Sequence, residues 1–426
     1  MRIEYFLFTI YLVLSFLLIP KIAFVRHAGL TLREVRLLLI FKILSGIAGA
    51  FYFKKIALSA DSLSFNEGGK IEYELLLSNP VQFFTDFKNG MQSYGLDRLF
   101  ETQHSFWADL RSILLYKFIA ILDLITRGNF YFNTIIFCTI VFFGHLAFYR
   151  IYSEIYKGNK LQVLLISFCL PSVLLYTSCI HKDGVIFLCL GIIGYIFFRA
   201  LSSNRLINIK YTLLFTLSMA AVFLFRNYVI VAIVPAMVAA LLCKLLPYKK
   251  RFIVLATYSI FFLLFFLSSF SESFINMPAA VVQRKVDFAA LGEATTNIAM
   301  NELKPTVPSF ILNFPQVINH YLFRPYLWEF TRPSILLTAL ELFCYQLLLL
   351  AFIFYRKKAT GPVHTFNIFG FAFVFNMMLV IGYTIPNIGA IVRYRSIFWV
   401  FLLCPLLCNT DWEKIPFFRK PVPGKA

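Results

Sequence analysis

The feature that most constrains this chain is a succession of apolar runs, most of them long enough to cross a lipid bilayer as a helix. About 20 apolar residues in a helix cover the roughly 30 Å of hydrocarbon. Of the 426 residues, 60% are hydrophobic and 14% charged, which excludes an ordinary soluble domain. The sequence therefore predicts an all-α polytopic transmembrane helix bundle, one integral membrane domain over 1–426, with about 11 spans. The predicted spans are 5–23, 36–53, 131–149, 162–179, 184–199, 211–225, 228–246, 252–270, 334–354, 366–384 and 396–409.

The short connections between these runs carry most of the positive charge, in a chain whose formal net charge is +19. If the spans alternate as predicted, all of the basic connections fall on one side. Short cytoplasmic loops collect Lys and Arg, so this side is expected to face the cytoplasm, in the cytoplasmic (inner) membrane. The basic connections are 21–36, 150–160, 199–210, 244–251 and 356–358.

Two long connections are predicted on the opposite, extracytoplasmic face, an outer loop at 54–130 and a second outer loop at 271–333. From Lys54 to Arg111 the first carries eight carboxylates against six basic residues, a local reversal of the charge of the whole chain. Within it, 113–126 is apolar but short for a span and holds two charges. We expect this stretch, and a second one near 71–86, to form helices in the membrane interface.

Polar residues collect in the connections of this outer face. Lys and Arg side chains converging from several turns would neutralise a phosphate leaving group, and a nearby carboxylate, Asp61, would act as general base toward an acceptor hydroxyl. Glu341, inside a predicted span, is expected to pack against one of these cations. The predicted phosphate-binding residues are Lys182, Arg324, Arg393 and Arg395, and the predicted supporting residues are Asp183, Arg226, Glu329 and His320.

Each of these residues also has a structural interpretation. Lys182 and Asp183 suit the end of a helix hairpin, and interfacial arginines commonly extend toward lipid headgroups. Arg324 and Glu329 suit an ion pair at a helix start, while Asp61 suits a helix N-cap. The residues alone leave both interpretations open.

Several kinds of chemistry lack support in the sequence. The eight cysteines lie in or beside apolar segments without a CxxC pair, which favours packing over a zinc site or disulfides. There is no Walker motif, no GxSxG and no metal-ligand spacing, so no metal residues are predicted. No basic segment leaves the membrane as a domain, so nucleic acid is not an expected partner.

The layout resembles the GT-C class of membrane glycosyltransferases. The resemblance is carried by Ala60-Asp61-Ser62 with the long loop after it, by the interfacial segment at 113–126, and by closely spaced spans through Pro171 and Lys182-Asp183. It implies a polyprenyl-phosphate-linked sugar as donor, an outward active site with Asp61 as base, no certain cofactor and, as in some relatives, a divalent cation. Other fragments resemble an uncharacterised group of bacterial proteins associated with surface polysaccharide: Pro171-Ser172 with His181-Lys182-Asp183, Arg324-Pro325-Tyr326, and Asn387-Ile388-Gly389 with Arg393-Tyr394-Arg395.

The chain departs from the GT-C pattern in two ways. The acidic loop follows the second predicted span where the class has it after the first, and the usual acidic pair is reduced to Asp61 followed by Ser62. The late outer loop with His320 and Arg324 is similar in placement to that of O-antigen polymerases and ligases, which also hold a lipid pyrophosphate with outward arginines.

The sequence thus predicts a glycosyltransferase that moves a sugar or oligosaccharide from a polyprenyl-phosphate carrier to a cell-surface glycan acceptor. Its expected partners are the lipid-linked donor, a glycan or lipid-linked acceptor and membrane lipids. The first alternative is an O-antigen or capsule repeat-unit polymerase or ligase. The alternative from another class is a transporter or lipid-linked oligosaccharide flippase, which would distribute charges along a path through the bundle.

Overall fold

The computed structural model describes residues 3–56, 60–87, 106–203, 208–270, 276–290, 296–329, 333–357 and 364–416. Within these ranges the chain is almost entirely helical and has no β-strand, only two isolated backbone bridges. Eight helices are long and apolar enough to cross a membrane, or up to ten if each of two bent helix pairs counts as one span. The prediction of an all-α, multi-pass membrane protein is confirmed at this level.

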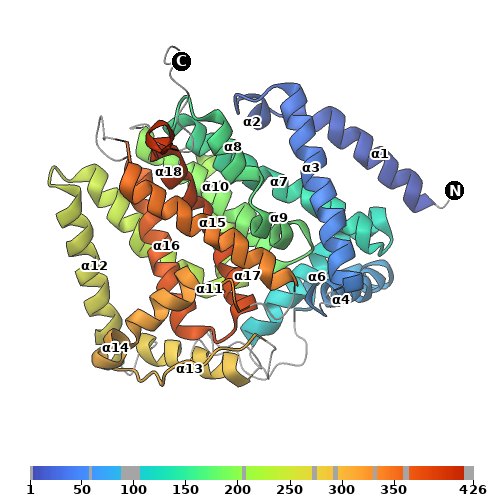
Figure 1. Cartoon of the computed structure of the whole chain (residues 1–426). Coiled ribbons are helices and arrows are strands. Elements are labelled where there is room, and N and C mark those ends of the chain that lie inside the picture. Colours follow the sequence, from blue (N-terminus) through green and yellow to red (C-terminus); the bar gives the residue numbers. More distant parts are fainter. Residues whose placement is uncertain are drawn as a thin grey trace, which may run out of the picture.

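The helices follow one another along the chain with short connections (Figure 1). The first ten are α1 (Ile3–Leu18), α2 (Ala23–Arg26), α3 (Leu32–Phe51), α4 (Ala60–Ser78), α5 (Pro80–Thr85), α6 (Phe106–Thr126), α7 (Phe130–Ile155), α8 (Lys160–Phe168), α9 (Pro171–Ser178) and α10 (Lys182–Ser202). The remainder are α11 (Ile209–Leu245), α12 (Lys250–Leu267), α13 (Met277–Ala290), α14 (Val307–Ile318), α15 (Pro333–Tyr355), α16 (Thr365–Thr384), α17 (Ile388–Ser396) and α18 (Val400–Asn409). Single turns of 3₁₀- or π-helix are η1 (Ile19–Lys21), η2 (Tyr52–Ile56), η4 (Ser268–Phe270), η5 (Asn319–Phe323) and η6 (Trp412–Lys414).

Local chemistry explains where several helices begin and break. Thr31 and Glu34 form a capping box at the start of α3. Pro171 stands in the first turn of α9, where its missing N–H costs nothing, and it divides the predicted span 162–179 into α8 and α9, bent by 44°. A second break, of 66°, separates α17 from α18.

Helix α11 corresponds to two predicted spans, 211–225 and 228–246, and its backbone is non-helical at Arg226 (φ −149°, ψ 76°). Arg226 contacts Asp183 at the start of α10, while the Lys244 Nζ donates to the carbonyl oxygens of Ala200 and Ser203 at the end of α10. The stretches 183–200 and 226–244 each rise about 27 Å at 1.5 Å per residue. Because α11 also starts only seven residues after α10 ends, the chain turns back at Arg226.

The helices at the centre of the bundle are buried, and those at its periphery expose apolar side chains. Some 83% of the apolar stretch of α7 is buried within the protein, against 11% for α12. Helices α7 and α10 meet at glycines: a Cβ on Gly191 would lie only 2.8 Å from the Gly144 carbonyl oxygen. Such small residues let helix backbones approach closely inside a bilayer, where packing drives association.

The basic connections meet at one end of the bundle, the upper end in Figure 1, where α2 and α8 lie. The Lys160 Nζ lies 2.6 Å from a Glu34 carboxylate oxygen, which joins the connections 150–160 and 21–36. The Lys250 Nζ lies 3.4 Å from the Thr365 hydroxyl, and Lys244 joins the end of α10. Helices α4, α6 and α13 lie at the opposite, lower end (Figure 1).

The predicted interfacial segments are helices at this lower end. The stretch 113–126 belongs to the longer α6, and 71–86 spans the end of α4 and all of α5, with a break at Asn79. Helix α6 is not among the candidate spans. The Lys117 Nζ of α6 lies 2.9 Å from a Glu72 carboxylate oxygen of α4, so the two helices form a paired layer. In the second outer loop, the described residues include α13, α14 and η5, with a non-helical stretch before α14.

Candidate active site

The site at the lower end is built on the start of α10. His181 is the N-cap of this helix: its Nδ1 accepts the backbone N–H of Asp183 at 3.2 Å. Asp183 follows in the first turn, where the partial positive charge of a helix N-terminus favours a carboxylate. Its side chain is fully buried, so it requires a cation or several donors.

Arg226 supplies that cation from the turn inside α11. Its Nη2 donates to Asp183 Oδ1 and its Nη1 to the Tyr228 hydroxyl. The guanidinium also lies 3.9 Å from the ring centroid of Tyr394 in α17, a cation–π contact. The break in α11, the start of α10 and the short helix α17 therefore converge on one buried ion pair.

Asp61 and Arg393 form a second ion pair beside the first. The Arg393 Nη1 lies 2.8 Å from Asp61 Oδ2, and its Nε lies 3.7 Å from Asp183 Oδ2. The His181 Nε2 lies 3.3 Å from Asp61 Oδ2, and its Nδ1 lies 2.7 Å from Asp183 Oδ2. His181 thus bridges two carboxylates, one buried and one 48% exposed.

The partners of Asp61 determine its protonation. The hydrogen bond from His181 and the charge of Arg393 hold the pKa of the Asp61 carboxyl well below its usual range, against the partial burial that acts to raise it. Asp61 is therefore an anion at neutral pH. A carboxylate with so low a pKa is a weak proton acceptor while it keeps these partners.

Three further cations surround the two ion pairs. The Lys182 Nζ donates to the Ser112 hydroxyl at 3.1 Å. Arg284 of α13 lies 4.2 Å from the Tyr228 ring centroid, and its burial lowers its pKa. Burial, followed by the charge of Arg284, lowers the pKa of Arg111 to about 10. Among the described residues the cluster holds five cations and three carboxylates: Arg111, Lys182, Arg226, Arg284 and Arg393 with Asp61, Asp183 and Asp287, the last of which acts on Arg284.

A small hollow adjoins the cluster between the end of α3 and the start of α10. It has room for little more than a water molecule and is lined by Phe53, Ser62, Tyr176, Cys179, His181 and Arg393. Both the imidazole and the guanidinium therefore border free space. A substrate group that entered this hollow would meet Arg393 and His181 together.

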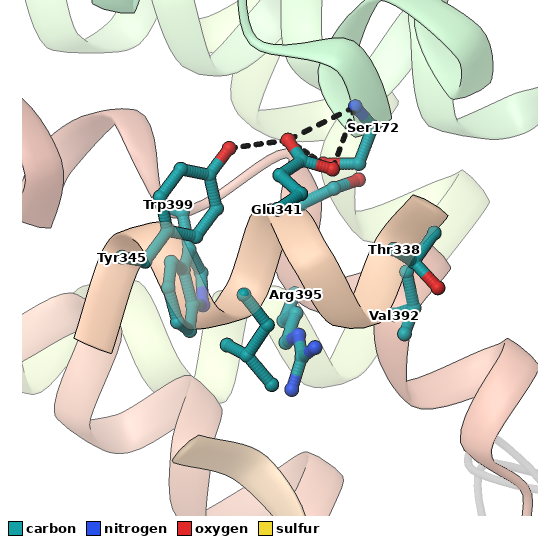
Figure 2. Close-up of a pocket in the computed structure, with 9 residues that line it drawn as sticks. Ser172, Thr338, Glu341, Tyr345, Val392, Arg395 and Trp399 are labelled. Carbon is teal, nitrogen blue, oxygen red and sulfur yellow. Dashed lines mark hydrogen bonds between the residues drawn. The ribbon is translucent and has the colours of Figure 1, made fainter. Parts of the chain in front are cut away.

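Arg395 occupies a different neighbourhood, although it is only two residues from Arg393. Its Nη1 donates to the carbonyl oxygens of Tyr321 and Arg324, each at 2.6 Å. It lines a second hollow of about 230 Å³ beside α15, which Figure 2 shows with Glu341, Tyr345 and Trp399.

Glu341 binds hydroxyl and amide donors in this second hollow. Its carboxylate accepts the Ser172 N–H at 3.1 Å, the Ser172 hydroxyl at 3.0 Å and the Tyr345 hydroxyl (Figure 2). These contacts place a carboxylate at the N-terminus of α9, which the helix dipole stabilises. Glu341 was expected to pack against a cation. It shares the hollow with Arg395, on which its charge acts, while the Nη1 of Arg395 donates to backbone carbonyls.

The late-loop residues gather near Arg395. The Arg324 Nη2 lies 2.6 Å from Glu329 Oε1, while Glu329 Oε2 accepts the Tyr326 N–H at 3.0 Å. His320 is buried, and burial followed by the charge of Arg324 lowers its pKa to about 4. The structural interpretation of Arg324 and Glu329, an ion pair near a helix start, matches this geometry.

The predicted residues therefore divide into two groups. Asp61, Lys182, Asp183, Arg226 and Arg393 lie around the start of α10, whereas His320, Arg324, Glu329 and Arg395 lie around η5.

Four residues of the cluster were not among those predicted from the sequence: His181, Arg111, Arg284 and Tyr228. One signal was available for Arg284: Val281 and Phe288, three and four residues away, place it on the apolar face of α13. A charged side chain on the apolar face of a helix becomes buried, so it needs a partner of opposite charge or hydrogen-bonding groups.

Among the described residues, no group of three or more His, Cys, Asp or Glu side chains could hold a metal ion. The divalent cation implied by the GT-C resemblance stays a prediction. Comparison of the chain with models of protein families, with curated proteins and with solved structures finds no match. What is shown is a multi-pass helical membrane protein in which Asp61, Lys182, Asp183, Arg226 and Arg393 lie together.

Proposed function

We propose that this protein is a membrane-embedded glycosyltransferase of the GT-C type that transfers a sugar or oligosaccharide from a polyprenyl-phosphate carrier to a cell-surface glycan acceptor. One observation carries the proposal: Arg393, beside the first hollow, contacts two carboxylates in a cluster whose described residues include more cations than anions. The reaction needs a site that binds a phosphate more strongly as negative charge develops on it.

The Asp61–Arg393 pair suits exchange with a phosphate. Asp61 is half exposed, so its carboxylate can leave Arg393 for water at modest cost. A phosphate oxygen would then take the Arg393 Nη1 in a charge-assisted hydrogen bond, while Lys182 and Arg284 supply further positive potential. The buried Arg226–Asp183 pair would stay in place and keep the site in shape.

The location of the cluster fits a lipid-borne donor. It lies at the end of the bundle opposite the basic connections, which by the positive-inside rule would be the extracytoplasmic end. The layer of α4 and α6 beside it would lie in the membrane interface, where the phosphate of a polyprenyl lipid sits. With α11 counted as two crossings and each bent pair as one, the bundle would have about 11 spans.

The polymerase or ligase alternative depends on the late loop. There the Arg324 guanidinium is paired with Glu329, and the Arg395 guanidinium donates to two backbone carbonyls. A pyrophosphate would have to displace partners from both arginines. This arrangement favours the first cluster as the site of phosphate binding.

A transporter is favoured by one buried group. Lys42 of α3 is 1% exposed and donates to the Thr177 hydroxyl at 2.7 Å, and His145 lies 3.4 Å from that hydroxyl. A cation within a span often marks a transport path. Among the described residues Lys42 forms no ion pair with a carboxylate of the cluster at the end of the bundle, so the enzyme remains the better proposal.

The test uses the full chain in lipid vesicles, with extracted polyprenyl-phosphate-linked sugars as donors and surface glycan as acceptor. Wild-type protein should transfer sugar, and Asp61→Asn should lower the rate about 100-fold or more while the protein stays inserted, because the cluster loses an anion that orients Arg393 and His181. Glu67→Gln is the matched control, because Glu67 is an exposed carboxylate on the same helix; it should stay within about twofold. Unchanged transfer by Asp61→Asn would remove Asp61 from the mechanism, and no transfer by the wild type would reject the proposal.

A further inference from the structure

We infer that Tyr326 and Trp328 form a platform that binds a sugar ring of the acceptor glycan, a sugar other than the one that reacts. The inference rests on the proposed glycosyl transfer and assigns a binding site for one of its two substrates. It adds a second place of contact beside the cluster around Arg393, so the enzyme would hold its acceptor as an extended chain of sugars.

A stacked pair of aromatic rings carries the inference. Trp328 lies in the turn between η5 and α15, and its indole stacks on the phenol ring of Tyr326. The two ring centroids are 4.8 Å apart, and the rings are within 11° of parallel. Trp328 is nonetheless 76% exposed, so the indole face turned away from Tyr326 is open. The turn therefore presents a flat aromatic surface to its surroundings.

Hydrogen bonds hold this turn from several directions. The Glu329 N–H donates to the Tyr326 carbonyl oxygen, and Glu329 Oε2 accepts the Tyr326 N–H, each at 3.0 Å. The Tyr326 hydroxyl donates to Asn319 Oδ1, and Glu329 Oε1 pairs with Arg324 at 2.6 Å. The two rings therefore keep their place before anything is bound, and binding costs little additional ordering.

The same turn is fastened to the helix that bears Arg393. The Arg395 Nη1 donates to the Arg324 carbonyl oxygen at 2.6 Å, and the Gln346 Nε2 of α15 donates to the Leu322 carbonyl oxygen at 3.1 Å. Because Arg393 and Arg395 both belong to α17, one short helix supports the platform and the arginine proposed to bind phosphate. A glycan chain of several sugars would lie on the platform while its reacting end faces Arg393.

A sugar ring suits this surface because it is polar at its rim and apolar on its faces. The C–H groups of a sugar face carry a small positive charge, and they pack on the negative face of an aromatic ring. The hydroxyl groups at the rim need water or polar neighbours. Arg324 and Glu329 border the turn, and their side chains are 23% and 18% exposed. An open aromatic face with charged groups beside it matches the surface of a carbohydrate.

The alternative occupant of the platform is the lipid bilayer. Trp and Tyr are common at the membrane interface, and Trp328 stands shortly before the start of α15. An anchor in fluid lipid needs neither a second ring in parallel contact nor a turn held at several points, because lipid adapts its shape to the side chain. The stacked pair and the rigid turn therefore favour the glycan, and the experiment separates the two occupants.

The experiment measures transfer to acceptors of different length, with the full chain in lipid vesicles and an extracted polyprenyl-phosphate-linked sugar as donor. The acceptors are surface glycan and its shorter fragments from partial hydrolysis. The variants are Trp328→Ala, which removes the open ring, and Trp328→Phe, which keeps an aromatic face. Phe270→Ala is the matched control, because Phe270 follows α12 at the same end of the bundle, is 86% exposed and would contact lipid.

We expect Trp328→Ala to raise the KM for long acceptors about 10-fold, with kcat and the KM for the donor within about twofold of wild type. The KM for the shortest fragment that the wild type accepts should stay unchanged, because that fragment does not reach the platform. Trp328→Phe should keep most of the wild-type preference for long acceptors, and Phe270→Ala should keep all of it. The unfolding temperatures should match that of the wild type, because both side chains are exposed.

A Trp328→Ala protein with the wild-type dependence on acceptor length would overturn the inference. A loss that is equal for short and long acceptors, or that Phe270→Ala shares, would also overturn it, because it would indicate contact with lipid. Binding of the long glycan fragments is measured without donor as well. If the wild type binds them more tightly than Trp328→Ala but transfers no sugar, the platform stands and the proposed function fails. If the wild type neither binds them nor transfers sugar, both fail.

Discussion

Two faces of one short helix, α17, show how differently two arginines can be used. Residues two apart in a helix point about 200° apart, so Arg393 and Arg395 face opposite neighbourhoods. Arg393 contacts the side-chain carboxylates of Asp61 and Asp183, whereas the Nη1 of Arg395 donates to the backbone carbonyls of Tyr321 and Arg324.

The two arginines differ in how easily a phosphate could replace their present partners. An exposed carboxylate can swing into water and leave its arginine to a phosphate, but a backbone carbonyl moves only if the chain around it unfolds. We therefore expect Arg393 to serve ligand binding and Arg395 to serve stability. The sequence analysis had assigned both to phosphate binding.

The largest expected effect is on transfer in Arg393→Ala. Loss of the guanidinium removes the charge that would neutralise the departing phosphate, which typically costs about 10²- to 10³-fold in rate. Arg393→Lys should recover only part of the activity, because an ammonium group cannot hold the carboxylates and a phosphate as a fork. The measurement is sugar transfer in vesicles together with binding of polyprenyl phosphate, with polyprenol as the uncharged comparison.

Arg324→Ala is the control for this variant, because Arg324 is paired with Glu329. It should keep transfer within a few-fold of wild type. If Arg324→Ala loses more activity than Arg393→Ala, the phosphate binds near Arg324 and not near Arg393. That result would favour the polymerase or ligase alternative.

The next largest effect is on stability in Arg395→Met. Methionine keeps much of the volume but leaves two carbonyl oxygens without their donor, at a cost of about 1–3 kcal/mol for each that stays buried. We expect a clear fall in the unfolding temperature of the protein in detergent micelles, with Arg393→Ala falling less. Equal stability of Arg395→Met and wild type would show that the carbonyl contacts are dispensable.

The smallest expected effect concerns pH and His320. Burial and Arg324 lower the pKa of this histidine from 6.5 to about 4, so the folded protein holds it neutral while the unfolded chain protonates it near pH 6.5. The unfolded state then binds more protons between these values, and stability falls as the pH drops from about 6.5 toward 4. His320→Gln should flatten that part of the curve of unfolding temperature against pH. An unchanged slope would mean that other groups dominate.

Much of the architecture followed from local properties of the sequence. The apolar runs predicted a multi-pass helical protein, and helices occupy nearly all of the predicted runs. The stretch 113–126 was expected to lie outside the set of spans because of its charges, and α6 is indeed not a candidate span. The break before Pro171 was not predicted, although a proline within an apolar run disfavours helix at the residue before it.

The candidate site was only partly accessible from the sequence. Charges at the outer turns indicated that Asp61, Lys182, Asp183, Arg226 and Arg393 belong to one region, and the structure places them together. Arg395 was grouped with Arg393 because the two are neighbours in sequence, and His181 was noticed only as part of a turn.

The sequence by itself determined which segments lie in lipid and which in water. It also determined that the basic connections lie together at one end of the bundle. Transfer into hydrocarbon and the placement of basic loops depend on each segment's own composition, so they can be inferred without knowing any contact. Only the tertiary structure decided which charge meets which. Asp61 and Arg393 are 332 residues apart, and their 2.8 Å contact exists because α4, α10, α11 and α17 pack around one point. Such a contact depends on helix directions and side-chain shape, which no single segment specifies.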